Sequence, residues 1–157
     1  MLVLLSTATV FAQQNEMDES AKSSRVQHTL FFELMGSSVF YGLNYDLTFR
    51  VAERHKIAVG LSLCHIPGFI TSIVPQTSYF FGRRHHLEVG IGYAHLRLWN
   101  GDGGNFYVMR IGYRHQRENG GLFWRIAFTP SVNHPLTDLA LAPGAGIAVG
   151  YTFNSSL

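Results

Sequence analysis

The sequence has little of several features on which common protein classes depend. It has a single cysteine, Cys64, which excludes an intramolecular disulfide and a multi-cysteine metal cluster. Charged residues make up only 14% of the 157 residues, against roughly 25% in an average soluble domain. The net charge of +2 is too small to indicate a nucleic-acid partner. The chain also lacks the run of about 18 apolar residues that a membrane-spanning helix requires.

What the sequence does contain is a regular alternation of apolar and polar residues. In residues 39–50, VFYGLNYDLTFR, one face of an extended strand would be wholly apolar, and the other nearly all small or polar. Such a strand reaches about 35 Å at roughly 3.3 Å per residue, which is about the length that a tilted strand needs to cross a bilayer. The apolar face comprises Val39, Tyr41, Leu43, Tyr45, Leu47 and Phe49.

The same alternation recurs in eight segments, and a chain of 157 residues forms one domain. The segments are residues 28–36, 39–50, 56–64, 71–81, 86–99, 106–116, 121–130 and 143–153. They predict an all-β fold, an eight-stranded antiparallel up-and-down transmembrane β-barrel. The segment 71–81 is the least regular, because Pro75 lacks a backbone donor, and a bulge or a later strand start is expected there.

The connections between the segments alternate in character. Residues 51–55, 82–86 and 116–121 are short and charged, whereas the connections between them are generally longer and rich in Gly, Pro and Asn. Short turns are typical of the periplasmic side of outer-membrane barrels, where both termini also lie. Aromatic residues are expected to form a girdle at each membrane interface. The periplasmic girdle would comprise Phe31, Phe32, Phe49, Phe80, Phe81, Tyr113, Phe123, Trp124, Tyr151 and Phe153, and the outer girdle Phe69, Trp99, Phe106, Tyr107 and Phe128.

The direction in which the two faces point separates a membrane barrel from a soluble one. In a soluble, lipocalin-like barrel the apolar face would fill the lumen and the charged face would meet water. The polar face here is crowded with glycine, which suits the cramped interior of a small barrel, and a water-facing surface has no need of such small residues. The apolar face carries Tyr and Trp at strand ends, where a lipid interface favours them. The pattern therefore favours the membrane barrel.

A membrane barrel of this sequence would collect charged side chains in its lumen. Because an isolated buried ion is costly, these carboxylates and guanidinium groups are expected to pair. We interpret them as a structural polar plug, with an ion or small-solute path as the alternative, for which eight strands leave little room. The predicted luminal charge network comprises Glu33, Asp46, Glu88, Arg110, Arg114 and Arg125, with Arg50 near the periplasmic rim.

The ends of the chain differ from its middle. Residues 1–12, MLVLLSTATVFA, are interpreted as a signal peptide for export across the inner membrane, followed by a flexible segment over residues 13–27. No Lys or Arg precedes the apolar stretch, so either the true start lies upstream or the n-region is unusually bare. The barrel is predicted over residues 28–153, with residues 154–157 as a C-terminal tail past the last strand.

Several motifs carry a resemblance to a known family. The segments LFFEL (30–34), YGLNYD (41–46), HLEVG (86–90), RIGYR (110–114), GGLFWR (120–125) with FTP (128–130), and GYTF (150–153) resemble the small OmpA-type outer-membrane β-barrel proteins of Gram-negative bacteria. The likeness covers about residues 28–153 and includes no catalytic motif. It implies an outer-membrane location, and recognition by the barrel assembly machinery through the aromatic residues Tyr151 and Phe153 of the last strand.

The expected function is that of a non-enzymatic, monomeric outer-membrane barrel with a structural or surface-interaction role through its external loops. Its expected partners are outer-membrane lipid and lipopolysaccharide, and we predict no catalytic residue, cofactor or metal. His95 and Arg97 would face outward at the outer interface, either snorkelling or contacting lipopolysaccharide phosphates. One alternative is an enzyme that modifies lipid A or phospholipid, which needs an outward Ser and His with a carboxylate; the strand pattern places no outward Ser near His95. The other is the soluble ligand-binding barrel.

Overall fold

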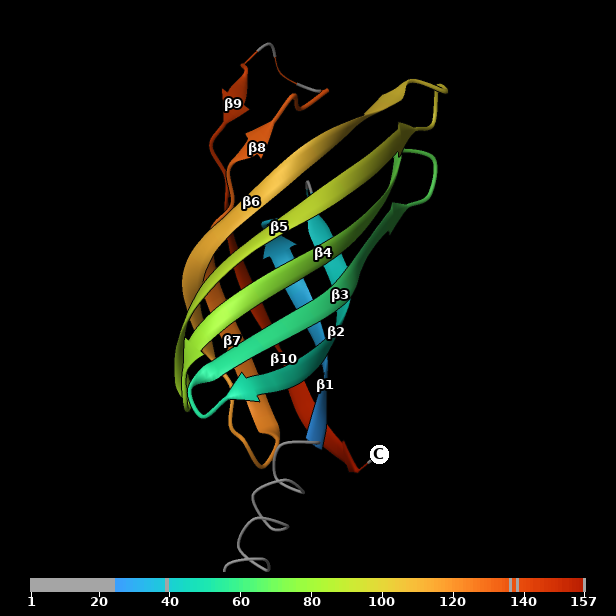
Figure 1. Cartoon of the computed structure of the whole chain (residues 1–157). Coiled ribbons are helices and arrows are strands. Elements are labelled where there is room, and N and C mark those ends of the chain that lie inside the picture. Colours follow the sequence, from blue (N-terminus) through green and yellow to red (C-terminus); the bar gives the residue numbers. More distant parts are fainter. Residues whose placement is uncertain (1–24, 39, 136, 138, 157) are drawn as a thin grey trace, which may run out of the picture.

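The computed structural model describes residues 25–38, 40–135, 137 and 139–156, and these form a closed antiparallel β-barrel (Figure 1). Eight long strands make the wall, each paired with the next in chain order until β10 pairs back with β1. This ring confirms the predicted eight-stranded fold. The wall strands are β1 (Arg25–Met35), β2 (Tyr41–Ala52), β3 (His55–Ile66), β4 (Ile70–Gly82), β5 (His85–Leu98), β6 (Gly103–His115), β7 (Gly121–Phe128) and β10 (Ala145–Ser156), and β8 (Ser131–Val132) and β9 (Leu141–Ala142) form a small added hairpin.

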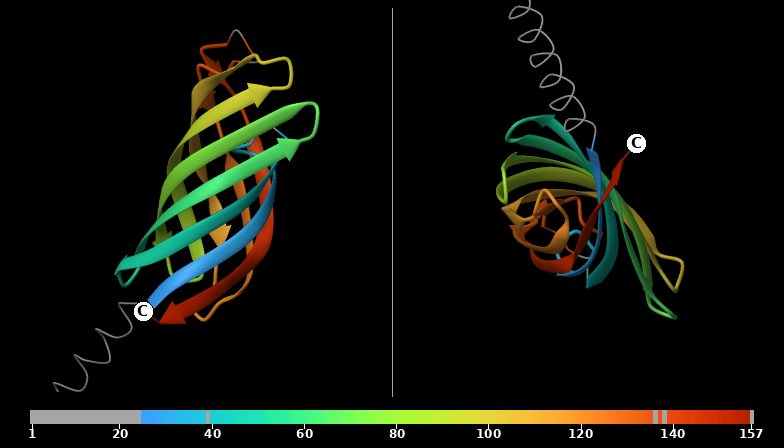
Figure 2. Two further views of the ribbon diagram at one scale, coloured as in Figure 1. Left: turned by 90° about the vertical axis from the view of Figure 1, so that its right-hand side faces the viewer. Right: turned by 90° about the horizontal axis from the view of Figure 1, so that it is seen from below.

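The two ends of the barrel differ. The tight turns after β2, β4 and β6 lie at the lower end of Figure 1, together with the start of β1 and the end of β10. At the opposite end the tips of β3 to β6 extend away from the rest of the wall, and β8 pairs with β6 beyond the end of β7 (Figure 2). We call these the short-turn end and the long-loop end. No helix in the described ranges is long and apolar enough to cross a membrane.

The wall turns its apolar side outward. In β2, Asn44 and Asp46 are buried in the lumen, whereas Leu43, Tyr45 and Phe49 are 53%, 40% and 40% exposed. The other wall strands repeat this pattern, because successive side chains of a strand point to opposite faces. A soluble barrel would bury its apolar side chains in the lumen. The distribution therefore contradicts the lipocalin-like alternative and is that of a transmembrane barrel.

Two predicted boundaries are wrong, because the ladder between β1 and β10 runs further than the apolar alternation does. β1 begins at Arg25 rather than at residue 28, and β10 continues to Ser156, so most of the predicted tail belongs to the wall. Polar side chains support this extension: Nε2 of Gln27 donates to Oδ1 of Asn154 (3.1 Å) and to two carbonyl oxygens of the β6–β7 turn (3.0 and 3.1 Å). The predicted signal peptide, residues 1–12, lies outside the described residues.

Strand β4 is more regular than the sequence suggested. The residues on both sides of Pro75 keep one register with β5, and Pro75 itself faces Leu61 of β3 without a shift. Pro75 points outward, and its missing N–H only interrupts the ladder. The predicted bulge or late start in β4 is therefore wrong; a register shift is found instead near the end of β2, between Arg50 and Ala52.

Four aromatic residues that were predicted for the girdles lie in the lumen. Phe31, Phe80, Phe106 and Phe123 are at most 2% exposed, because each occupies an inward position of its strand. Outward rings such as Phe49 do lie on the apolar wall. An aromatic residue type suggests an interface, but the alternation of the strand decides which face the ring joins.

The lumen is layered along the barrel axis. Toward the long-loop end it holds an apolar cluster made of Cys64, Ile70, Val74, Ala94, Leu96, Phe106 and Val108. The middle holds charged side chains, and small wall residues give them room. A Cβ placed on Gly60 would lie only 2.0 Å from Oδ1 of Asp46, so glycine at this position allows the carboxylate to lie against the wall.

Candidate functional site

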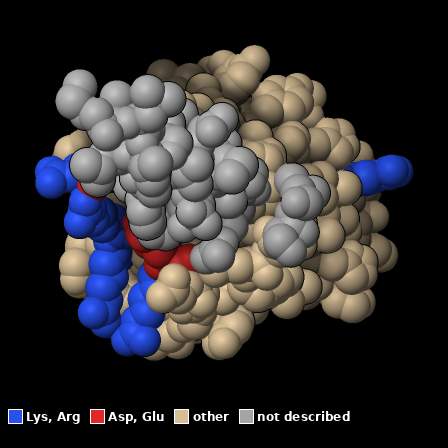
Figure 3. Space-filling model, turned by 60° about the horizontal axis from the view of Figure 1, so that its bottom comes forward, with Lys and Arg blue, Asp and Glu red and all other residues tan. Residues whose placement is uncertain are grey.

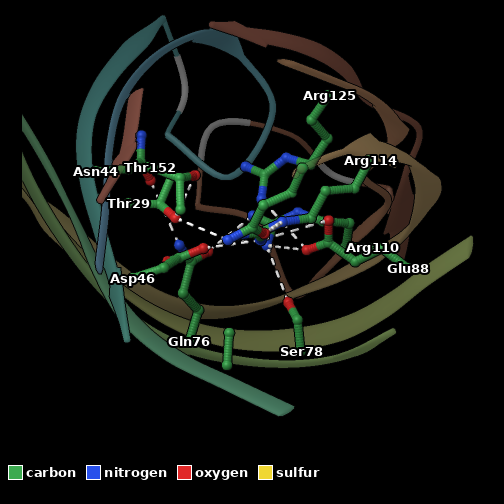
Figure 4. Close-up of polar contacts among 12 residues, drawn as sticks. Thr29, Asn44, Asp46, Gln76, Ser78, Glu88, Arg110, Arg114, Arg125 and Thr152 are labelled. Carbon is green, nitrogen blue, oxygen red and sulfur yellow. Dashed lines mark hydrogen bonds and ion pairs between the residues drawn. The ribbon is translucent and has the colours of Figure 1, made fainter. Parts of the chain in front are cut away.

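Charged side chains from five strands meet in the middle of the lumen. Figure 4 labels those of β2, β5, β6 and β7. Each is at most 3% exposed, because each occupies an inward position of its strand. They are Glu33 of β1, Asp46 of β2, Glu88 of β5, Arg110 and Arg114 of β6, and Arg125 of β7. The structure thus brings together all six residues that the sequence pattern assigned to the luminal network.

Glu88 is the centre of the network. Its Oε1 lies 3.3 Å from Nη1 of Arg125 and 3.5 Å from Nη1 of Arg110. Its Oε2 lies 3.8 Å from Nη1 of Arg114. One carboxylate therefore contacts all three luminal guanidinium groups, and β5, β6 and β7 are tied together by these contacts.

The other two carboxylates each take one arginine. Oε1 of Glu33 lies 2.8 Å from Nη2 of Arg125, and Oδ2 of Asp46 lies 2.9 Å from Nη1 of Arg114. Ser37 supports the first pair by donating its hydroxyl to Oε2 of Glu33 over 2.7 Å. These three carboxylates balance the three guanidinium groups, which is what charges buried from water require.

A chain of hydrogen bonds that begins at Arg114 extends the network to the seam between β1 and β10. Nε of Arg114 donates to Oε1 of Gln116 (2.7 Å), and Nε2 of Gln116 donates to Oγ1 of Thr29 (3.1 Å). The hydroxyls of Thr29 and Thr152 lie 3.0 Å apart across the seam. The strands that close the barrel are therefore joined by side chains as well as by backbone bonds.

Aromatic rings cover two of the arginines. The guanidinium carbon of Arg114 lies 4.5 Å from the centroid of Phe80 and 4.7 Å from that of Phe123, and that of Arg125 lies 4.8 Å from Phe31. Such contacts favour a cation that has lost its water. The sequence prediction placed these phenylalanines at the membrane interface; their inward position in the alternation was the signal that would have located them.

The lumen also holds two basic side chains that the predicted network left out. Lys56 of β3 is 1% exposed, and its Nζ donates to Oε1 of Gln27 over 3.5 Å. His86 is also 1% exposed, and its Nε2 lies 3.3 Å from the carbonyl oxygen of Gln116. The sequence analysis counted His86 both in the connection 82–86 and as the first residue of the segment 86–99, and the structure makes it an inward residue of β5. Strict use of the alternation would have placed both residues inside.

The network fills the lumen rather than lining an open path. Glu33, Glu88, Arg114 and Arg125 have no surface that a water-sized probe reaches. A conducting path would leave its charged lining accessible to water. The geometry therefore favours the plug over the ion or solute path.

The long-loop end carries an open cavity of about 250 Å³ above the plug. Its lining includes Ser37, Phe106 and Thr129, from the turn between β1 and β2, from β6 and from the connection after β7. At the rim the rings of Phe40 and Phe69 lie 5.7 Å apart, and Trp99 is 78% exposed. Phe69 and Trp99, which were predicted for the outer girdle, are both exposed at this end of the barrel.

Polar side chains form a row on the outer wall near the same end. Nδ1 of His65 lies 2.9 Å from Oγ1 of Thr71, and Nδ1 of His95 lies 2.7 Å from Oδ1 of Asn105. Arg97 faces Thr71 across the β4–β5 ladder and points outward, as does His95, which agrees with the prediction for both. His65, Thr71 and Arg97 line a shallow pocket of about 220 Å³.

Two solved structures align with most of the chain. Neisserial surface protein A has 10% sequence identity, the match covers 85% of this chain and 96% of that chain, and the TM-score is 0.43. Ail, the attachment invasion locus protein of Yersinia pestis, has 10% identity, with 82% and 95% covered and a TM-score of 0.37. No protein-family model and no curated protein matches the sequence. The barrel assignment rests on the strand ladder of the chain itself.

The remaining predicted sites are placed as follows. Tyr151 and Phe153, the predicted assembly signal, are 61% and 46% exposed on the outer wall beside the β1–β10 seam. Their recognition by the assembly machinery stays a prediction. In the described part of the chain no group of three or more His, Cys, Asp or Glu side chains is placed to hold a metal ion.

Proposed function

We propose that the protein is a non-enzymatic, integral outer-membrane barrel that acts at the cell surface through its long-loop end. The observation that carries this proposal is the inverted distribution of side chains, apolar outside and paired charges inside. In lipid every backbone polar group must be hydrogen-bonded within the protein, and a closed strand ladder meets that requirement. The apolar wall would then face the acyl chains.

The short-turn end would face the periplasm, since short turns and both termini lie on that side of bacterial outer-membrane barrels. In this proposal residues 1–12 direct export, and Tyr151 and Phe153 are recognised by the barrel assembly machinery. In this proposal the chain acts as a monomer, because the eight wall strands pair in a closed ring and only the two-residue strand β9 is left as an edge among the described residues. Its lipid partners include lipopolysaccharide, whose phosphates would meet Arg97 and His95 on the outer wall.

The sealed lumen supports a surface role over transport. With the plug in place, the parts of the barrel that can meet another molecule outside the bilayer are the loops. The long-loop end offers Phe69 and Trp99 at its tips and the cavity lined by Thr129, whereas the short-turn end offers mainly charged turn residues. We therefore assign surface binding to the long-loop end.

The test uses two epitope tags in otherwise identical chains, one after Asn100 at the long-loop end and one after Glu118 at the short-turn end. We expect both proteins to fractionate with the outer membrane, to resist carbonate extraction and to migrate differently in SDS gels before and after boiling. Only the tag after Asn100 should be accessible to protease and antibody on intact cells. Release by carbonate together with identical gel mobility would overturn the membrane assignment, and accessibility of only the tag after Glu118 would overturn the orientation.

A lipid-modifying enzyme is the second candidate, and one observation favours it. Thr71 and His65 form an outward hydroxyl–imidazole pair at 2.9 Å, in the pocket that Arg97 also lines. A hydroxyl beside a base is the arrangement of an activated nucleophile, although no carboxylate in the described ranges is hydrogen-bonded to His65 to orient it. Turnover of lipid A or phospholipid by the purified barrel, abolished by Thr71→Val, would replace the non-enzymatic proposal with this one.

A further inference from the structure

Three histidines on the outer wall form the same contact at the short-turn end. His28 of β1, His55 of β3 and His85 of β5 each direct Nδ1 to the hydroxyl of a tyrosine on the following strand. The first of these contacts, to Tyr45, is 2.5 Å long. The other two join His55 to Tyr79 and His85 to Tyr113. We call these six residues the His–Tyr belt.

The three pairs share one register. In each pair the tyrosine lies two residues before the residue that directly faces the histidine, so the contact runs diagonally across the ladder. Each imidazole also packs against the ring of a directly facing residue, at centroid distances of 5.3 Å to Phe153, 5.1 Å to Phe81 and 5.1 Å to His115. The fourth strand pair, β7 with β10, does not repeat the His–Tyr contact, and in its ladder Leu122 faces Tyr151. One unit is thus repeated around most of the barrel.

Each His–Tyr pair leaves one hydrogen-bond donor, the Nε2–H group of the histidine, on the outer wall. When the tyrosine hydroxyl donates to Nδ1, the neutral imidazole carries its proton on Nε2, which remains free to donate. Exposed arginines lie in the adjoining turns, and Arg54, Arg84 and Arg117 make no ion pair within the described ranges, whereas Arg83 pairs with Glu53. Figure 3, which brings the short-turn end forward, shows Lys and Arg side chains gathered along one edge. Donors and cations together fit an oxyanion such as a phosphodiester.

A shallow, open groove on the apolar wall lies beside the tyrosine of one of these pairs. It has a volume of about 370 Å³, and its lining includes Ile57, Thr77, Tyr79 and Ile91. Tyr79 is also the tyrosine of the His55 pair, so the groove begins where the belt contact ends. Thr77 is a small outward residue among larger apolar ones, which leaves the wall hollow at this place. An apolar groove that leads away from a phosphodiester donor matches an acyl chain attached to a headgroup.

We infer that the His–Tyr belt binds the phosphodiester headgroups of anionic phospholipids, with an acyl chain of one such lipid in the groove beside Tyr79. This inference rests on the proposed function, because the belt can meet lipid headgroups only if the wall lies in a bilayer. Three pairs give three headgroup sites in the leaflet next to the short turns, and the His55 site holds its lipid most firmly because the groove adds apolar contact.

The test is native mass spectrometry of the full barrel released from vesicles that contain equal amounts of phosphatidylglycerol and phosphatidylcholine. Both headgroups offer a phosphodiester, but only phosphatidylglycerol has a net negative charge. A phosphate that the belt holds beside the unpaired turn arginines should therefore be retained a few-fold more often as phosphatidylglycerol than as phosphatidylcholine. His55→Phe should lose one phosphatidylglycerol, and the triple change of His28, His55 and His85 to Phe should lose the preference. Thr77→Leu, which fills the groove, should weaken retention of one lipid. His95→Phe is the matched control at the opposite end and should behave as the original chain.

The lipid-binding inference and the proposed function can be refuted by different outcomes of this experiment. Equal retention of the two lipids, or an unchanged preference in the triple variant, would overturn the inference while leaving the membrane barrel intact. Displacement of the retained lipids by added inorganic phosphate would show that the belt binds free phosphate rather than headgroups. If the histidine variants do not fold, as judged from gel mobility before and after boiling, Tyr79→Phe removes only the hydroxyl and should still lose one lipid. A chain that does not insert into vesicles at all would instead refute the proposed function.

Discussion

The pair formed by Arg125 and Glu33 offers the sharpest test of the charged plug. Both side chains are fully buried, and Nη2 of Arg125 lies 2.8 Å from Oε1 of Glu33. Arg125→Leu would leave Glu33 with the Ser37 hydroxyl as its hydrogen-bond partner, whereas Glu88 would keep Arg110 and a longer contact to Arg114. Leaving one buried charge without its partner destabilises a protein by about 3 to 5 kcal/mol, and we expect a loss of that size.

The double variant should be more stable than the single one. Glu33→Leu together with Arg125→Leu removes one charge of each sign and leaves apolar side chains in their place, a change that is often close to neutral for a buried pair. We therefore expect Arg125→Leu/Glu33→Leu to recover most of what Arg125→Leu loses, with a coupling energy of about 3 kcal/mol between the two positions. Ile126→Leu serves as the matched control, because Ile126 is the next residue, faces outward and is 53% exposed.

The assay is urea unfolding of the barrel in lipid vesicles, followed by the fluorescence of Trp99 and Trp124 and checked by gel mobility. The unfolding free energies of the original chain, Arg125→Leu, Glu33→Leu and the double variant together give the coupling energy. The dependence of the unfolding free energy on urea concentration must stay constant across these four proteins. Additive losses at the two positions would refute the ion-pair network. A loss in Ile126→Leu as large as that in Arg125→Leu would refute the assignment of the two faces.

Three further outcomes are expected. Deleting residues 154–157 should lower the urea midpoint in vesicles, because Asn154, Ser155 and Ser156 pair with the start of β1, and an unchanged midpoint would show that the ladder ends earlier. Changing Tyr151 and Phe153 to Asp should leave the chain in the periplasm, as measured by fractionation and blotting; normal outer-membrane levels would refute the assembly signal. Burial lowers the pKa of His134 in the loop between β8 and β9, so the unfolded loop takes up a proton first as the pH falls. Proteolysis of that loop should therefore increase below about pH 6.5, and His134→Gln should remove the increase.

The alternation of residues was enough to predict which side chains point into the barrel. Side-chain direction along a strand is a local property with a period of two, so Asp46 and Tyr45 are assigned to opposite faces without knowledge of their neighbours. The same rule places Arg110, Arg114 and Arg125 in the lumen. Where residue type was followed instead, the prediction was wrong: Phe31 was given to the interface because it is aromatic, although its position in the strand is inward.

The contacts between strands came only from the tertiary structure. Which carboxylate meets which arginine depends on register and on closure of the ring, and these bring Glu33 of the first strand beside Arg125, 92 residues later in the chain. The extension of the wall at Gln27 and Asn154 depends on a polar contact across the seam, which carries no apolar signal in either segment. The His–Tyr belt likewise exists only because three strand pairs share one diagonal register. A period of two determines the face of each side chain, but pairing is non-local, because it is decided by the packing of all eight strands at once.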